Sequence, residues 1–294
     1  MKTPPFLKEV YPFTPSRYCL DSGHSLSYLD EGKEDSLPTI FLHGNPTWSF
    51  YYRKAVLAWR ELGRCIVPDH LGCGLSDKPS SKEFSYQLKD HANNIRNLIN
   101  SLHIENFNLV MHDWGGAIGM TAFGDEPERV RKIVLLNTAA FPSSDVPRRI
   151  LFCRLPLLGE FWVRAMNGFA FPATWMGSTK GLTESTKKGL LFPYDNWKNR
   201  IAIWKFVRDI PHEKNHPSKA VLEKTSQQLA NFTGTPSMAC WGMKDFCFHG
   251  GFLNEWKKRW PNLHVHRLED LGHYVLEDSF EDVRSKVEPF LFES

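Results

Sequence analysis

Apolar, β-prone runs recur along this chain between stretches with helical periodicity. The runs that predict strands are 39–42, 64–67, 108–111, 132–136, 237–241 and 263–268. The helical stretches lie at about 50–62, 86–102, 116–123, 251–259 and 278–292. Strands that alternate with helices in this way predict a mostly parallel, doubly wound sheet covered on both faces, and therefore the α/β class.

The alternation breaks between residues 141 and 231. This span contains helical patches, several prolines and four tryptophans, but no clear apolar strand. We therefore predict a core domain formed by residues 1–140 and 232–294, with a helical cap domain inserted at 141–231. The aromatic side chains of the cap are expected to roof a pocket, although most of them would simply form the interior of the cap.

Composition narrows the class of protein. With 294 residues, 41% apolar and 23% charged, the chain has the size and composition of one large α/β domain or of a domain with an inserted lid. A net charge of +3 from scattered basic residues argues against nucleic acid as a partner. No apolar run is long enough for a signal peptide or a membrane span, so we expect a cytoplasmic protein. The six dispersed cysteines predict free thiols.

Asp113 stands where an apolar strand turns abruptly into a helix, in the run Phe107-Asn-Leu-Val-Met-His-Asp-Trp-Gly-Gly. Generic α/β-hydrolases carry a nucleophilic Ser at this turn. A carboxylate has no proton to lose, so it can displace a leaving group from an sp3 carbon and form an alkyl ester on the enzyme. The free N–H groups of the helix N-terminus favour the ionised carboxylate. The alternative is that Asp113 is only a helix N-cap.

An ester on Asp113 needs a base that activates water, and His is the usual base. His273 lies in a loop between the last predicted strand and the last helix, and the chain order nucleophile, acid, His is that of α/β-hydrolases. Asp245 follows the fifth predicted strand, where this order requires the acid that orients the His. The end of the fourth strand holds uncharged Asn137. Asp278 is predicted to cap the last helix.

Asn45 and Trp114 are candidate donors for the leaving group. Asn45 follows the first predicted strand, where hydrolases form half of their oxyanion hole. Its amide NH2 and the Trp114 indole N–H could stabilise a departing anion such as halide, by roughly 2.7–4 kcal/mol each. No cofactor and no metal is implied, because these groups suffice. Other residues near the motifs are interpreted as structural, namely His43, Asp69, His70, Gly72, Gly74, Ser76 and His112.

Five ordered segments together resemble the haloalkane dehalogenases. They are His43–Trp48, Asp69–Pro79, His112–Gly116, Gly242–Asp245 and Gly272–Tyr274. The resemblance implies an α/β-hydrolase fold, with Asp113 as nucleophile, His273 as base and Asp245 as acid, and with Asn45 and Trp114 as the halide-binding pair. One branch of that family carries a Glu acid where this chain has Asn137, so the chain resembles the branches with Asp after the following strand.

The resemblance extends to a second group, the bacterial β-lactone decarboxylases that form long-chain cis-olefins. The segments similar to these enzymes and to the third dehalogenase branch are 141–144, 192–200, 206–211 and 245–248. The same five site residues would serve both groups.

Hydrolytic dehalogenation is the first function predicted. Asp113 would displace halide from an apolar haloalkane, and water activated by His273 would hydrolyse the ester to an alcohol. The alternative is decarboxylation of a β-lactone at the same site. Epoxide hydrolysis is disfavoured because it uses a pair of cap tyrosines and the cap contains only Tyr194. A binding protein without activity is disfavoured because the triad and both donors are present. An aromatic-rich cap can leave apolar patches that promote association, so a homo-oligomer stays open.

Overall fold

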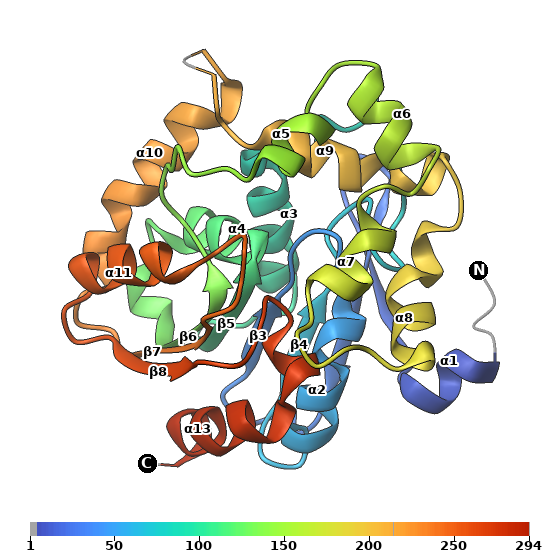
Figure 1. Cartoon of the computed structure of the whole chain (residues 1–294). Helices are drawn as coiled ribbons and strands as arrows, with labels where there is room; N and C mark the ends of the chain where they lie inside the picture. Colours follow the sequence, from blue (N-terminus) through green and yellow to red (C-terminus); the bar gives the residue numbers. More distant parts are fainter. Residues whose placement is uncertain (1–4, 214, 294) are drawn as a thin grey trace.

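An eight-stranded sheet forms the centre of the computed structural model, which describes residues 5–213 and 215–293 (Figure 1). The strand order is β1-β2-β4-β3-β5-β6-β7-β8. The strands are β1 (Ser16–Cys19), β2 (Ser25–Glu31), β3 (Thr39–Leu42), β4 (Cys65–Pro68), β5 (Phe107–Asp113), β6 (Val130–Thr138), β7 (Ser237–Gly242) and β8 (His264–Leu268). Strands β3 to β8 pair in parallel, whereas β1 and β2 are antiparallel. The predicted α/β class with a mostly parallel sheet is confirmed.

All six predicted strands are present, and two more precede them. β1 is short and largely exposed, and β2 alternates between buried and partly exposed positions, so neither forms a continuous apolar run. The parallel strands β3, β4, β5 and β7 are buried along their whole length, which is why their sequences are apolar throughout.

The sheet is covered on both faces by helices of the core. These helices are α2 (Arg53–Trp59), α3 (Leu88–Ser101), α4 (Trp114–Phe123), α11 (Gly250–Arg259), α12 (Val275–Asp278) and α13 (Phe280–Phe292), whereas the short helix α1 (Pro5–Val10) packs against the helix Glu184–Leu191. One apolar layer joins the sheet to α3, α4 and α11, and the other joins it to α2 and α13. Among the described helices, none has the length and apolar character that a membrane crossing requires.

The starts of α2, α3 and α13 each differ from the sequence prediction by two or three residues. Tyr86 has a φ of 62°, outside the helical region, so α3 begins at Leu88. The prediction that Asp278 caps the last helix is wrong, because Asp278 ends α12 and Ser279 precedes α13. The Asp278 carboxylate instead accepts backbone N–H groups from Gly272 and Thr179, and so joins the loop before His273 to the segment after α7.

Between β6 and β7 the described residues form helices and no strand. They are α5 (Arg148–Cys153), α6 (Leu158–Arg164), α7 (Ala170–Met176), α8 (Glu184–Leu191), α9 (Ile201–Asp209) and α10 (Pro217–Gln228). In Figure 1, α5, α6 and α9 lie above the sheet, over the end where β5 passes into α4. Helix α10 packs on α3 and α4 of the core. The cap limits of 141 and 231 therefore stay a prediction.

Candidate active site

Asp113 is the last residue of β5, and α4 begins at the next residue. Its backbone has φ 52° and ψ −125°, a conformation that residues other than Gly rarely adopt and that is typical of strained functional turns. Although Asp113 occupies the N-cap position, its side chain makes no capping hydrogen bond. The carboxylate instead lines a cavity, so the interpretation of Asp113 as a simple helix cap does not fit.

Glycines make room for this turn. A Cβ added to Gly44 would lie 1.9 Å from Oδ1 of Asp113, and one added to Gly115 would lie 2.0 Å from the carbonyl oxygen of Leu42. The loop after β3 and the start of α4 can therefore approach Asp113 and the sheet only because these two residues have no side chain.

The Asp113 carboxylate is oriented from two directions. Its Oδ1 accepts the backbone N–H of Asn45 at 2.6 Å, and its Oδ2 lies 3.7 Å from Nε2 of His273. The backbone carbonyl of Asp113 also accepts the hydroxyl of Thr138 at the end of β6. Both the side chain and the backbone of Asp113 are thus fixed by neighbouring strand ends.

His273 lies between two carboxylates, as the sequence predicted. Its Nδ1 is 2.7 Å from Oδ2 of Asp245, which leaves Nε2 facing Asp113. Asp245 is buried, and its other oxygen accepts the N–H of Cys247 at 2.7 Å. The structure therefore brings together three side chains that lie 132 and 28 residues apart along the chain, in the relative arrangement of a nucleophile, a base and an acid.

Asn137 supports the loop that carries Asp245. Its amide donates to the carbonyl oxygens of Gly242 at 2.9 Å and Phe248 at 3.3 Å, and its own oxygen accepts the N–H of Gly242 at 2.8 Å. In the sequence, this position is notable only because its side chain carries no charge. Its structural function has no signal in the sequence, because all three bonds join β6 to residues more than 100 positions away.

Burial and neighbouring charges act in opposite directions on the pKa values of Asp113 and His273. Burial raises the pKa of Asp113 above its ordinary 3.8, although His273 and the N–H groups of Asn45 and Trp114 lower it. Burial alone would lower the pKa of His273, but Asp245, by its charge and hydrogen bond, and Asp113 together raise it above 6.5. The sequence prediction that the helix N-terminus favours an ionised Asp113 did not include the effect of burial on its pKa.

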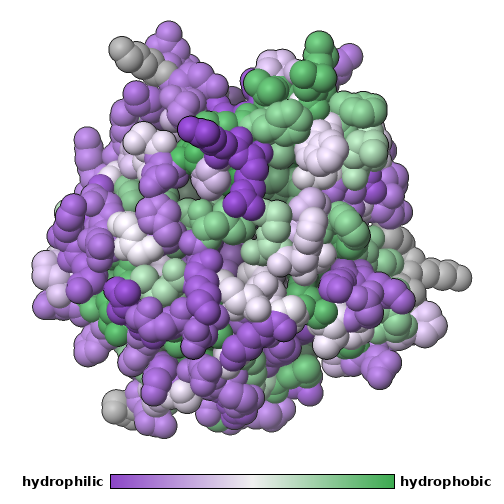
Figure 2. Space-filling view, viewed as in Figure 1, coloured by the Kyte–Doolittle hydropathy of each residue, from purple (hydrophilic) through white to green (hydrophobic). Residues whose placement is uncertain are grey.

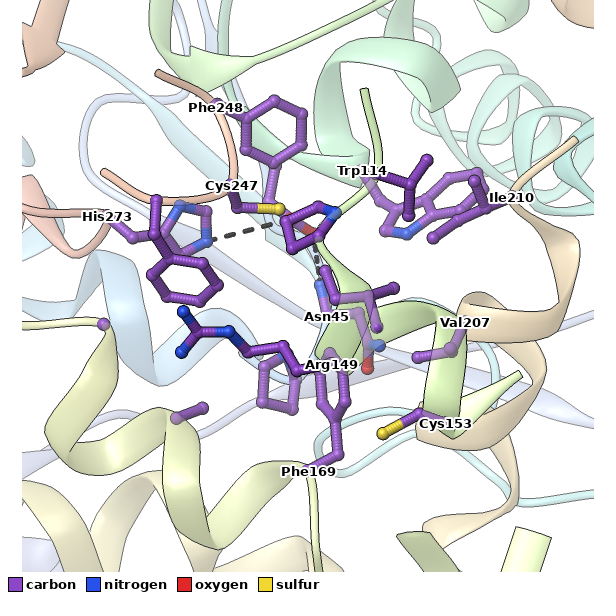
Figure 3. Close-up of a pocket in the computed structure, with 18 of the residues that line it drawn as sticks. Asn45, Trp114, Arg149, Cys153, Phe169, Val207, Ile210, Cys247, Phe248 and His273 are labelled. Carbon is purple, nitrogen blue, oxygen red and sulfur yellow. Dashed lines mark hydrogen bonds and ion pairs between the residues drawn. The ribbon is translucent and has the colours of Figure 1, made fainter. Parts of the chain in front are cut away.

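Asn45 and Trp114 border the same cavity as Asp113 (Figure 3). The side-chain Nδ2 of Asn45 donates to the carbonyl oxygen of Ile203 in α9 at 3.1 Å. One amide hydrogen is therefore engaged with α9, and the amide group carries a second hydrogen. Trp114 is half-buried, and its ring packs against Phe206 of α9 at 5.3 Å between centroids.

The cavity has a volume of about 600 Å³ and lies between the sheet end and the helices α5, α7 and α9. Its walls are mainly apolar, and the labelled side chains of Figure 3 show Phe169, Val207 and Ile210 around it. Arg149 and Cys247 also line it, and neither was singled out by sequence analysis. A cavity of this size and lining suits a ligand that is largely hydrocarbon.

Histidines beside the site have structural contacts, in agreement with their interpretation. His43 accepts the N–H of His70 at Nε2, and His112 contacts the carbonyl oxygen of His273 at 2.9 Å. The loop residue Asp69 accepts N–H groups from Ser49 and Leu75. Within residues 5–213 and 215–293, no cluster of three or more His, Cys, Asp or Glu has the arrangement of a metal site.

Comparison with known proteins shows the family to which the chain belongs. A family model described as the alpha/beta hydrolase fold matches residues 38–172. The chain is 38% identical over 278 residues to a cis-3-alkyl-4-alkyloxetan-2-one decarboxylase of Shewanella oneidensis. The aligned region covers 93% of this chain and 87% of that protein. It is 37% identical over 290 residues to the protein of the same name from Xanthomonas campestris pv. campestris, over 96% of this chain and 97% of that one.

Haloalkane dehalogenases are also similar to the chain. Haloalkane dehalogenase 2 of Mycobacterium tuberculosis is 29% identical over 280 residues, or 92% of each chain. Among solved structures, the haloalkane dehalogenase DbeA from Bradyrhizobium elkani superposes with a TM-score of 0.85 at 24% identity, covering 95% of this chain and 97% of its own. At that identity the superposition shows the fold alone. The chain therefore belongs to the α/β-hydrolase fold family, among relatives that include cis-3-alkyl-4-alkyloxetan-2-one decarboxylases and haloalkane dehalogenases.

Proposed function

We propose that this enzyme converts a cis-3,4-dialkyl β-lactone into a cis-alkene and carbon dioxide, with Asp113 as nucleophile, His273 and Asp245 as its charged partners, and Asn45 and Trp114 as leaving-group donors. The observation that carries the proposal is the identity of 38% and 37% to two β-lactone decarboxylases over nearly the whole chain, against 29% to a haloalkane dehalogenase. This order of identities favours β-lactone decarboxylation, the alternative predicted from the sequence, over dehalogenation.

The first step is attack of the Asp113 carboxylate on C4 of the lactone ring. A bond forms between the Asp113 oxygen and C4, the bond from C4 to the ring oxygen breaks, and the ring carboxyl becomes a free carboxylate. In the second step the C3–carboxyl bond breaks. Its electron pair forms the C3=C4 double bond, carbon dioxide leaves, and the ester bond from C4 to Asp113 breaks. Asp113 is regenerated, and no water, oxidant or reductant is consumed.

The stereochemistry of this route agrees with a cis product. Displacement by Asp113 inverts C4 of the cis lactone. When the carboxylate and the Asp113 ester oxygen then leave from opposite sides of the C3–C4 bond, the two alkyl chains lie on the same side. Inversion followed by anti elimination therefore gives the cis-alkene.

The polar side chains of Asn45, Trp114 and His273 would each contribute to this route. The second amide hydrogen of Asn45 and the indole N–H of Trp114 would donate to the ring oxygen as it acquires charge. Asp245 and Asp113 raise the pKa of His273 and so favour its protonated form, which would balance the negative charge of the opened lactone. The apolar walls of the 600 Å³ cavity would accept the two alkyl chains and would leave the new carboxylate poorly solvated, which favours loss of carbon dioxide.

Haloalkane hydrolysis is the second candidate, and the position of His273 favours it. Its Nε2 faces Asp113 at 3.7 Å, a geometry suited to activating water against an ester on Asp113. Ester formation would also remove the Asp113 charge, which is one of the causes that raise the pKa of His273. His273 would then release its proton more readily at the stage that needs a base.

The decisive experiment supplies purified enzyme with a cis-3,4-dialkyl β-lactone and, separately, with bromo- and iodoalkanes of increasing chain length. Alkene and carbon dioxide from the lactone, abolished in Asp113→Ala, are the expected result. Halide and alcohol release without alkene would favour dehalogenation. Conversion of the lactone to a hydroxy acid would contradict the elimination step, because it would mean that water reaches the intermediate first.

The variant His273→Phe separates the two routes further. Hydrolysis of an alkyl ester needs the base, so a haloalkane should leave this variant with the alkyl group attached to Asp113, seen as added mass on the intact protein. Elimination needs no water, so the lactone should still give alkene in this variant, more slowly, without a stable adduct. If the haloalkane is turned over normally by His273→Phe, His273 is not the base.

A further inference from the structure

Large apolar side chains are exposed on one part of the molecule. Ten of the thirteen exposed large hydrophobic residues among the described part of the chain fall between residues 152 and 197. Figure 2 shows hydrophobic residues gathered at the upper right, where Figure 1 has α6. We call this surface the apolar cap face and define it as Phe152, Leu155, Leu157, Leu158, Phe161, Trp162 and Met166. Its concentration in one short segment distinguishes it from scattered surface hydrophobics.

Helix α6 has the reverse of the usual distribution of polar and apolar residues. Its charged residues Glu160 and Arg164 form an ion pair, with side chains that are 24% and 11% exposed. Leu158 and Phe161 are 66% and 58% exposed. A helix in water normally presents its charged side to solvent, so this orientation indicates an apolar environment outside α6.

The turn before α6 adds to this surface. Leu157 is 81% exposed and has a φ of 60°, an unfavourable conformation for a side chain with a Cβ. Its carbonyl oxygen accepts the N–H of Phe161, which fixes the turn at the start of the helix. The chain therefore presents its most exposed leucine at the tip of a well-defined turn, beside Leu158.

The segment that carries this face is also strongly basic. Residues 141–200 contain nine Lys and Arg and only four Asp and Glu, whereas the remainder of the chain contains more acidic than basic residues. Two of these arginines, Arg148 and Arg149, are exposed at the start of α5, one turn before Phe152. Exposed aromatic and aliphatic side chains next to basic ones are the combination that binds anionic lipid surfaces.

The cavity opens at this same face. Phe152, Trp162 and Trp175 are 45%, 42% and 61% exposed, and all three also line the cavity above Asp113. The apolar lining is thus continuous from the catalytic floor to the outer surface. An apolar molecule dissolved in a bilayer could pass along this lining without crossing water.

We propose that the apolar cap face docks on an anionic lipid bilayer, with the turn at Leu157 and the outer side of α6 inserted into the headgroup region. A second copy of the chain fits this face less well. A two-fold dimer would bring two copies of the same basic segment together, which repel each other. The docking rests on the surface alone and holds whichever reaction Asp113 performs.

The test is sedimentation of the full-length enzyme with vesicles of phosphatidylglycerol and phosphatidylethanolamine, compared with phosphatidylcholine vesicles. The test variant is Leu157→Ser/Leu158→Ser/Phe161→Ser, whose three positions lie outside the cavity lining. The matched control is Leu37→Ser/Leu57→Ser/Leu62→Ser, which removes three leucines that are 42%, 40% and 45% exposed elsewhere on the core. Both variants should keep the basal turnover of a short, water-soluble substrate.

Wild type and the control variant should bind the anionic vesicles, and the test variant should bind at least about ten-fold more weakly. Replacing Arg148 by Gln should reduce binding by about five-fold, and 0.5 M salt should also weaken it. Equal binding to phosphatidylcholine, equal loss in the control variant, or no binding by wild type would overturn the proposal. So would a wild-type dimer in light scattering that the test variant makes monomeric without any vesicle binding, because the face would then be covered by a second copy.

Discussion

Gly44→Ala provides a direct test of the geometry around Asp113. The added Cβ would stand 1.9 Å from Oδ1 of Asp113, 2.3 Å from its Cβ and 2.4 Å from its Cγ. Ordinary van der Waals contact begins at 3.4 Å, so the carboxylate would have to move by about 1.5 Å. Its backbone cannot follow easily, because it ends β5 and its carbonyl oxygen accepts the hydroxyl of Thr138. The hydrogen bond from the Asn45 N–H would be lost as well.

A displacement of this size should reduce turnover by about 100-fold or more, since misplacement of a reacting group by 1 Å can cost about that factor. The assay measures the rate of product formation and, by intact mass, the rate at which a haloalkane labels Asp113. Gly234→Ala is the control, because a Cβ there meets no atom within 4 Å. Turnover within three-fold of wild type in folded Gly44→Ala protein would refute the assignment of Asp113 as the attacking group in this conformation.

A stability measurement keeps the test informative if Gly44→Ala folds poorly. All three contacting atoms belong to the Asp113 side chain, so Asp113→Gly removes the clash and also the backbone strain at φ 52°. Gly44→Ala should therefore cost much less stability in an Asp113→Gly background than in wild type. A double-mutant cycle on urea unfolding measures this coupling. Equal costs in both backgrounds would mean that the destabilisation comes from elsewhere in the loop.

Three further predictions concern other parts of the structure. Asn45→Leu should slow ester formation by about 100-fold in single-turnover experiments while the intact protein stays folded, because it removes one leaving-group donor; an unchanged rate would exclude the side chain from catalysis. Glu277→Ala should lower the free energy of unfolding by about 3–5 kcal/mol, because Glu277 (2% exposed) pairs with Arg53 (6% exposed) and the cation would be left buried and unpaired; the exposed Glu269→Ala should leave the urea midpoint unchanged. Burial and, to a smaller extent, the charge of His70 lower the pKa of His91 well below 6.5. Below pH 6.5 the unfolded chain therefore binds a proton that the folded protein does not, so the free energy of unfolding falls as the pH falls. His91→Phe should remove this contribution, and its stability advantage over wild type should grow by up to about 1.4 kcal/mol per pH unit below 6.5; parallel unfolding curves at pH 8 and pH 5 would contradict it.

The parallel strands could be predicted from the sequence because both of their faces are buried. β5 and β7 have no exposed position, so their sequences are apolar throughout. β1 could not be predicted in this way, since it is an exposed edge strand of four residues whose stability comes from pairing with β2. The start of α3 was misplaced because the conformation of Tyr86 depends on its packing, which includes a hydrogen bond from its hydroxyl to Pro79.

The candidate catalytic residues could be predicted because parallel strands end at the same edge of the sheet. Asp113 is the last residue of β5, and Asp245 and His273 follow β7 and β8, so their order along the chain is sufficient to expect them at one edge of the sheet. The contributions of Gly44 and Asn137 could not be predicted, since each depends on contacts between segments 69 or more residues apart. The cap side chains at the cavity wall, such as Arg149, also depend on helix packing that has no periodic signal.

The triad itself does not distinguish decarboxylation from dehalogenation. Both proposed reactions would begin with the same bond between Asp113 and an sp3 carbon, and they would diverge only in how that ester is removed. Hydrolysis needs water at the ester carbonyl and a neutral His273. Elimination needs a carboxylate on the neighbouring carbon and little water. The apolar lining of the 600 Å³ cavity suits two alkyl chains and therefore favours the second route. The charge of Asp113 helps to raise the pKa of His273, so esterification of Asp113 would favour the neutral His273 that hydrolysis requires. We therefore expect selectivity to depend on the cavity walls, and on whether the ester on Asp113 carries a neighbouring carboxylate, more than on the residues that form the bond.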